Sequence, residues 1–111
     1  MIPSYAYAHE KLDIAIACLM IPVASAAEAI ACAMAELRLA FYEEQPPHEA
    51  KHYIREIETI MAGPGTWEER AAGLSDPDVR RLSRAFHSLD RLMTRLYYEA
   101  LYGRSQQPAT S

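Results

Sequence analysis

Residues 77–103 read PDVRRLSRAFHSLDRLMTRLYYEALYG. Apolar side chains recur in this stretch at intervals of three and four residues, which is the period of a helix that packs one face against neighbouring helices. The positions in this apolar seam are Val79, Leu82, Phe86, Leu89, Met93, Leu96 and Ala100. The sequence therefore predicts a long helix near the end of the chain, with one face turned toward a core.

Basic side chains follow the same period on another face of this expected helix. They are Arg80, Arg84, His87, Arg91 and Arg95. Tyrosines follow them along the chain, and tyrosine is frequent at protein interfaces. We expect the following residues to contact a partner: Arg80, Arg84, Arg91, Arg95, Tyr98, Leu101 and Tyr102.

The composition favours an all-α fold. The chain has 111 residues, which fits one domain, and half of them are hydrophobic. Alternating runs of β-branched and aromatic residues bounded by turns are absent, so little of the sequence suits a sheet. We predict an antiparallel bundle of about five helices, four long and one short, in a single domain over residues 1–103, followed by a polar tail at 104–111.

Proline, glycine and capping residues set the expected helix boundaries. We place helices at about 4–20, 25–44, 47–61, 66–73 and 76–103, with Asp76 as the N-cap of the last helix and Gly103 as its C-terminal cap. Pro22 leaves two possibilities for the first two segments. They form either one kinked helix or a hairpin, and a hairpin could bring Cys18 near Cys32.

Charge is unevenly distributed along the chain. Residues 1–76 hold 5 Lys/Arg against 12 Asp/Glu, whereas residues 77–111 hold 6 against 3, so the two parts carry −7 and +3. The arginine series could face acidic helices of the same bundle or of a second copy. It could instead bind an acidic protein or a nucleic acid, although nucleic-acid-binding domains are usually basic throughout.

The cysteine content and the hydropathy pattern favour a reduced, cytoplasmic protein. Cys18 and Cys32 both lie in apolar helical sequence, where a thiol acts as a small hydrophobic group. Residues 14–23 resemble the apolar core of a signal peptide, but the basic segment that should precede it is missing. The charge-free run 14–27 is shorter than the roughly 20 residues of a membrane span, so we expect no membrane segment.

His48-Glu49-Ala50-Lys51-His52 matches the H-E-x-x-H pattern. It resembles the zincin metalloprotease motif, in which two histidines one turn apart bind zinc. Lys51 and the lack of a matching downstream pattern depart from that family. The helical period also directs both histidines away from the apolar face of their segment. We therefore expect no cofactor or metal, with His48 and His52 as the alternative metal ligands.

Arg81 and His87 enclose five residues at the start of the last predicted helix. This spacing resembles the R-x(4–6)-H motif of HEPN-type ribonucleases, which are small all-helical domains that form dimers. The resemblance implies metal-independent RNA cleavage, with His87 as the acid/base and Arg81 as a phosphate contact. On a straight helix, however, these two side chains point about 120° apart.

The sequence as a whole favours an interaction protein over an enzyme. Apolar residues in 14–24, Leu39 and the late tyrosines exceed what one small core needs, which indicates a homodimer or a protein partner. Our leading hypothesis is a small non-catalytic protein-interaction module, such as an adaptor, an inhibitor, an antitoxin-like protein or a mobile-element accessory factor. The alternative hypothesis is the HEPN-like ribonuclease.

Overall fold

The structure is a computed structural model that describes residues 5–20, 25–42 and 44–106. These residues form five α-helices and one short 3-10 turn, with no β-strand among them. The elements are α1 (Ala6–Leu19), α2 (Ala26–Ala40), η1 (His48–Ala50), α3 (Lys51–Ile60), α4 (Trp67–Ala72) and α5 (Asp76–Gln106). The predicted all-α bundle is confirmed.

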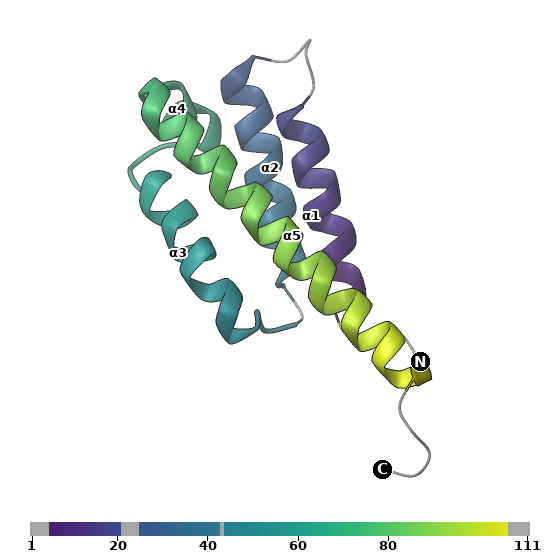
Figure 1. Cartoon of the computed structure of the whole chain (residues 1–111). Coiled ribbons are helices and arrows are strands. Elements are labelled where there is room, and N and C mark those ends of the chain that lie inside the picture. Colours follow the sequence, from purple (N-terminus) through teal and green to yellow (C-terminus); the bar gives the residue numbers. More distant parts are fainter. Residues whose placement is uncertain (1–4, 21–24, 43, 107–111) are drawn as a thin grey trace.

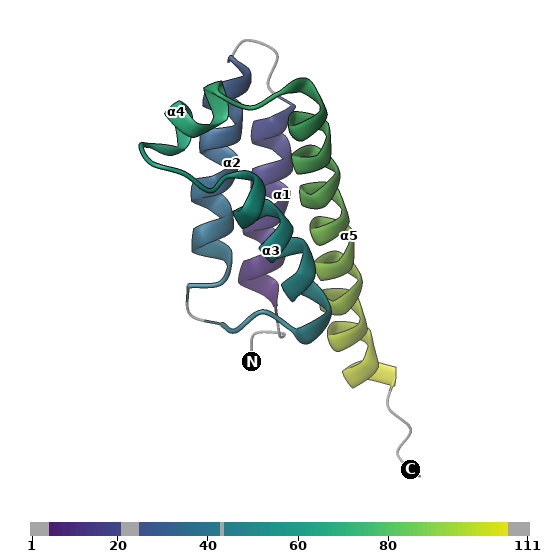
Figure 2. The ribbon, with the colours of Figure 1, turned by 90° about the vertical axis from the view of Figure 1, so that its left-hand side faces the viewer.

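The helices surround one core. α1 and α2 form a hairpin, α5 packs against α1, α3 packs against α5, and the short α4 packs against α2. α5 has 31 residues and is therefore about 46 Å long, roughly twice the length of α1 or α2. Its last turns extend beyond the other helices (Figures 1 and 2). α5 thus combines a packed segment with a projecting end.

The first two segments form a hairpin and not a continuous kinked helix. α1 ends at Leu19, α2 begins at Ala26, and the two helices lie side by side. Pro22 itself lies outside the described residues. A disulfide joins Cys18 to Cys32, whose Cα atoms are 5.9 Å apart. The expectation of two reduced thiols in apolar surroundings was therefore wrong: Cys18 is buried, but Cys32 is exposed, and the pair forms a disulfide.

The apolar seam of α5 forms one side of the core, as its period predicts. Leu82, Phe86, Leu89 and Met93 are completely buried. They meet Leu12 of α1 and Ile57 of α3 in one apolar cluster, which also includes residues of α2. Val79 and Leu96, nearer the ends of the seam, are partly buried and pack against this cluster. Because this seam is buried, the opposite side of α5 is exposed to solvent.

Three helix boundaries differ from the sequence prediction. α2 ends at Ala40 and not near residue 44, because Phe41 leaves the helix and lines a groove with Pro46 and Trp67. The hydroxyl of Ser75, and not Asp76, caps α5 by accepting a hydrogen bond from the Asp78 amide at 3.3 Å. α5 also continues past Gly103 to Gln106, since one glycine inside a helix costs only about 1 kcal/mol.

The turn before α4 is built as its sequence indicates. Gly63 and Gly65 both have positive φ angles, of 140° and 95°, which suit glycine and strain other residues. Thr66 then starts α4 with a capping box, in which its hydroxyl accepts from the Glu69 amide and the Glu69 side chain accepts from the Thr66 amide. This turn lets the chain reverse and lay α4 on α2.

Candidate functional site

The residues that we expected to contact a partner lie almost entirely on one exposed stripe of α5. We call this set the α5 stripe: Arg80, Arg84, Arg91, Arg95, Tyr98 and Tyr102, all of which are exposed. At 100° per residue they fall within an arc of about 60°, on the side of the helix opposite the buried seam. Leu101 is the exception, because it lies off this arc and is partly buried.

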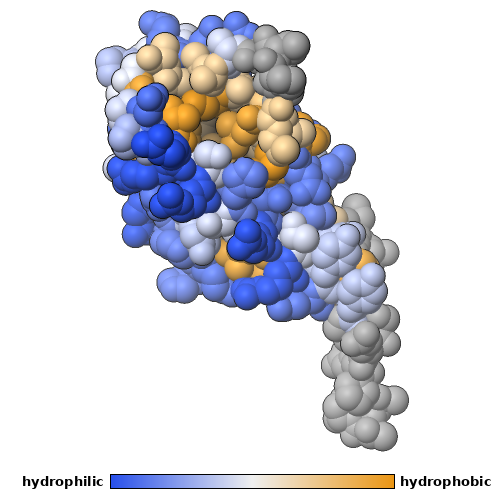
Figure 3. Space-filling view, turned by 45° about the horizontal axis from the view of Figure 1, so that its top comes forward, coloured by the Kyte–Doolittle hydropathy of each residue, from blue (hydrophilic) through white to orange (hydrophobic). Residues whose placement is uncertain are grey.

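Among the residues that the structure describes, no acidic side chain of another helix pairs with the arginines of the stripe. Arg95 lies 3.7 Å from Glu99, one turn along the same helix. Within the described part of the chain, Arg80, Arg84 and Arg91 form no ion pair or hydrogen bond. Three guanidinium groups on one face are therefore available to an outside partner. Hydrophilic side chains cover much of the α5 face in Figure 3, and apolar ones gather where α1, α2 and the start of α5 meet.

The tyrosines continue the stripe onto the projecting end of α5. Tyr98 is 43% exposed and Tyr102 is 53% exposed. Their rings stack on each other with centroids 5.8 Å apart, and Tyr97 meets Tyr98 edge-on at 5.1 Å. These contacts hold large aromatic surfaces in fixed positions, which lowers the entropy lost when a partner covers them.

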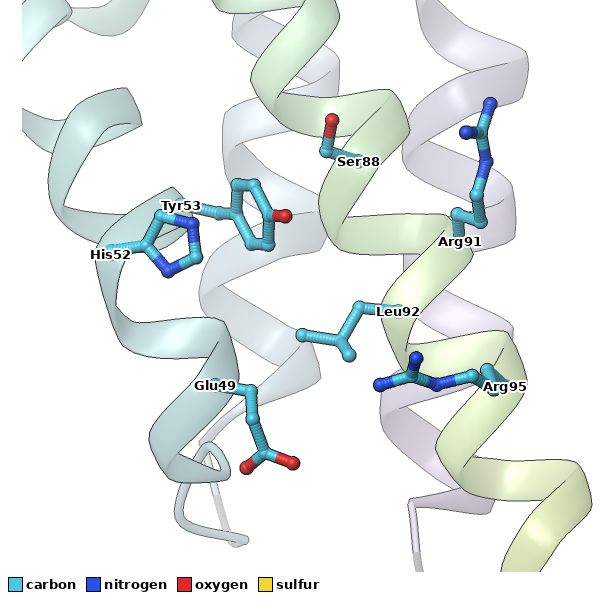
Figure 4. Close-up of a pocket in the computed structure, with 7 residues that line it drawn as sticks. All are labelled: Glu49, His52, Tyr53, Ser88, Arg91, Leu92 and Arg95. Atoms are coloured by element: carbon cyan, nitrogen blue, oxygen red, sulfur yellow. The ribbon is translucent and has the colours of Figure 1, made fainter.

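A groove of about 340 Å³ runs between α3 and α5 beside the stripe. It is lined by Glu49, His52, Tyr53, Ser88, Arg91, Leu92 and Arg95. Figure 4 shows Arg95 reaching from α5 toward α3, whereas Arg91 points along α5 and away from α3. The groove offers a carboxylate, an imidazole, hydroxyl groups and a guanidinium around a small apolar floor at Leu92. Such a mixed lining suits a polar protein segment that lies along the stripe.

The two histidines of the H-E-x-x-H pattern are both exposed. His48 lies in the 3-10 turn η1 and His52 in the first turn of α3, so a regular α-helix does not relate them. The His52 ring packs against the Tyr53 ring with centroids 3.8 Å apart. Neither belongs to the close group of metal-ligating atoms found among the described residues.

The structure does not bring Arg81 and His87 together. Arg81 donates a hydrogen bond to the Asp78 carboxylate at 3.2 Å and lies 3.9 Å from the Glu56 carboxylate of α3. His87 is exposed and lies at the edge of the α5 stripe, about 20° outside its arc. Two carboxylates already compensate the charge of Arg81, so a phosphate would have to compete with them.

A cluster that the sequence analysis did not predict lies between α1 and α5. His9 and Asp13 of α1 face Asp90 of α5, and one potential ligand atom from each lies within 4.8 Å of the others. The Nδ1 atom of His9 lies 3.1 Å from the Thr94 hydroxyl, and its Nε2 atom lies 3.6 Å from the Asp13 carboxylate. The sequence shows the four-residue spacing of His9 and Asp13, but nothing in it links them to residue 90.

The cluster changes the protonation of Asp90. The pKa of Asp90 is raised from 3.8 to about 7, mainly by burial and in addition by a hydrogen bond to the facing Asp13 carboxyl and by repulsion from it. The Asp90 carboxyl group therefore keeps its proton at mildly acidic pH.

Comparison of the chain with protein-family models, with curated proteins and with solved structures found no match. Separately, no helix within the described residues has both the length and the apolar character needed to cross a membrane.

Proposed function

We propose that this protein is a non-catalytic interaction module that binds an acidic protein segment along the α5 stripe. The observation that supports this most directly is the set of exposed arginines Arg80, Arg84 and Arg91, which lack an acidic partner among the described residues. Arginine and tyrosine are the residue types most enriched at energetically important interface positions. The stripe presents both types over a length of about 33 Å, from Arg80 to Tyr102.

Charge favours an acidic protein over a nucleic acid as the partner. Residues 1–76 carry a net charge of −7, so an extended polyanion would meet repulsion beyond α5. A protein segment of limited length can follow the stripe and avoid the acidic helices. Its carboxylates would pair with the guanidinium groups, and an apolar side chain would cover the tyrosines.

Binding to a defined probe tests this proposal. We expect a fluorescein-labelled 15-residue polyglutamate peptide to bind the purified chain at low salt, as measured by fluorescence anisotropy. Arg84→Glu/Arg91→Glu should weaken this binding at least about tenfold, because each substitution replaces an attractive charge with a repulsive one. Arg38→Glu/Arg55→Glu is the matched control, since it makes the same change of charge on α2 and α3.

Two outcomes would contradict the proposal. Equal losses in the stripe and control variants would mean that net charge alone controls binding. Tighter binding of a uridine 15-mer than of polyglutamate would identify a nucleic-acid surface, and RNA cleavage that is lost in His87→Ala would support the HEPN-like alternative.

We also propose that the chain forms a homodimer through the outer face of the α1–α2 hairpin. Tyr7 and Ile14 of α1 are exposed and share one face, since they are seven residues apart. Leu39 of α2 is exposed as well. The small side chains of Cys32 and Ala35, which precede it on the same face of α2, are also exposed. An apolar face of this kind can pack on its own copy around a two-fold axis.

Light scattering after size-exclusion chromatography tests the dimer. We expect a mass of about two chains for the native protein and about one chain for Ile14→Glu/Leu39→Glu. The control is Lys51→Glu/Thr59→Glu, which introduces two glutamates at exposed positions of α3 and leaves the α1–α2 hairpin unaltered. Ile21, which the sequence also included in the apolar excess, lies outside the described residues. A native protein that is monomeric at high micromolar concentration would exclude this interface.

The cytoplasmic location stays a prediction, and the Cys18–Cys32 disulfide weighs against it. Disulfides are common in oxidising compartments and rare in the cytosol. Rapid alkylation of the protein in intact cells distinguishes the two cases. Two alkylated thiols would favour the cytoplasm, and none would favour an oxidising compartment.

A further inference from the structure

His9, Asp13 and Asp90 form a compact group of metal-ligating side chains at the α1–α5 contact, beside Tyr98 of the α5 stripe. Their nearest potential ligand atoms all lie within 4.8 Å of one another. Two different helices supply them, so the packing of α5 on α1 holds the group together. Asp13, whose side chain is 54% exposed, opens the group to solvent, while His9 is mostly covered.

Among the described residues, the carboxyl groups of this cluster are only partly compensated: Asp13 lies 3.6 Å from His9, and Asp90 shares a hydrogen bond with Asp13. The Oδ1 atom of Asp90 is buried and has no hydrogen-bond partner among the described residues. A buried carboxylate oxygen without a partner is costly, and the facing Asp13 adds repulsion. No lysine or arginine forms an ion pair with either aspartate within the described residues. A bound cation would supply the missing positive charge.

His9 is oriented as a ligand would be. Its Nδ1 atom can donate a hydrogen to the Thr94 hydroxyl at 3.1 Å, which leaves the Nε2 lone pair directed toward Asp13. Metal-binding histidines usually have such a second partner, because it fixes the tautomer and the ring orientation. Tyr97 stacks on the imidazole at 4.8 Å and Tyr98 meets it edge-on at 5.9 Å, so the ring is held on two sides.

The geometry points to a three-ligand zinc site formed by His9 Nε2 and by one carboxylate oxygen each from Asp13 and Asp90. Imidazole with carboxylates suits zinc, whereas magnesium and calcium favour oxygen ligands alone. Ligand atoms around tetrahedral zinc lie about 3.4 Å apart, so the longest of the three distances must shorten by up to about 1.4 Å. A change of rotamer at Asp13, whose side chain is 54% exposed, would bring its carboxylate oxygen closer to the other two atoms. The fourth position faces solvent on the Asp13 side and would hold water.

Isothermal titration calorimetry tests the site: the chelator-treated protein is titrated with zinc chloride at pH 7.5. We expect saturable binding of one zinc per chain. His9→Ala and Asp90→Asn should each lower the zinc affinity at least about tenfold. Loss of a residue that only hydrogen-bonds to a metal ligand already lowers metal affinity by about ten- to a hundredfold. Asp13→Asn changes an exposed side chain, so we expect this variant to fold. It should weaken zinc binding, and it therefore tests the site even if the other two variants fold poorly.

The control variant is His48→Ala/His52→Ala, which removes the exposed histidines of the H-E-x-x-H pattern. It should leave zinc affinity unchanged within about twofold. Cobalt substitution should give visible absorption bands of a four-coordinate site, and Asp13→Asn should abolish them. Loss of zinc binding in the control variant, or its retention in Asp13→Asn, would overturn the assignment, as would equal affinity for magnesium.

Discussion

Replacing Asp90 with asparagine removes a carboxylate whose ionisation the fold opposes. The pKa of Asp90 is raised from 3.8 to about 7, first by burial and then by the facing Asp13. Between these two pH values the folded state holds a proton that the unfolded chain releases. The folded state is therefore favoured below pH 4, and this contribution to stability is lost as pH rises toward 7.

The size of this effect follows from the pKa difference. A change from 3.8 to about 7 in a fully buried group would correspond to about 4 kcal/mol in the free energy of unfolding. Asp90 is only partly buried and Asp13 is largely exposed, so solvent screens the repulsion. We therefore expect a loss of about 1 to 2 kcal/mol between pH 5 and pH 8.

Urea unfolding followed by circular dichroism at pH 5 and pH 8, with a chelator present, measures this loss. Asp90→Asn should show it to a much smaller extent, because the amide cannot ionise but can still donate a hydrogen bond to Asp13. Glu10→Gln is the control, since it removes one exposed carboxylate from α1 and should keep the pH dependence of the native protein. The reasoning fails if Asp90→Asn and the native protein lose the same free energy between the two pH values.

Three further predictions concern stability. Phe86→Ala should lower the free energy of unfolding by about 3 to 5 kcal/mol in a urea titration, because Phe86 is the largest completely buried side chain among the described residues. The control is the exposed His87: His87→Ala should change the free energy of unfolding by less than about 0.5 kcal/mol. Reduction of the Cys18–Cys32 disulfide, which links residues 14 apart, should cost about 3 kcal/mol in the same assay; an equal effect of reductant on a variant with both cysteines replaced would contradict this. Thr66→Ala should cost about 1 kcal/mol through loss of the α4 cap, and a neutral result would mean that packing alone holds α4.

The α5 stripe was largely predictable because it depends on one helix. Once residues 77–103 form a helix, the apolar seam and the arginines must lie on different faces, whatever surrounds them. Leu101 lies off the stripe and is partly buried, and its contact with a partner stays a prediction. That Arg80, Arg84 and Arg91 have no acidic partner in the described part of the chain could not be predicted, since it depends on where the acidic helices pack.

Local sequence determined the helices, most of their caps and the buried face of each, because periodicity and capping act over a few residues. The packing of one helix on another determined which side chains from different helices meet, because such contacts join residues far apart in the chain. The docking of α1 on α2 placed Cys18 beside Cys32, and that of α5 on α1 brought Asp90 to His9 and Asp13. These two juxtapositions join residues 14 and about 80 positions apart, a separation over which no helical period operates.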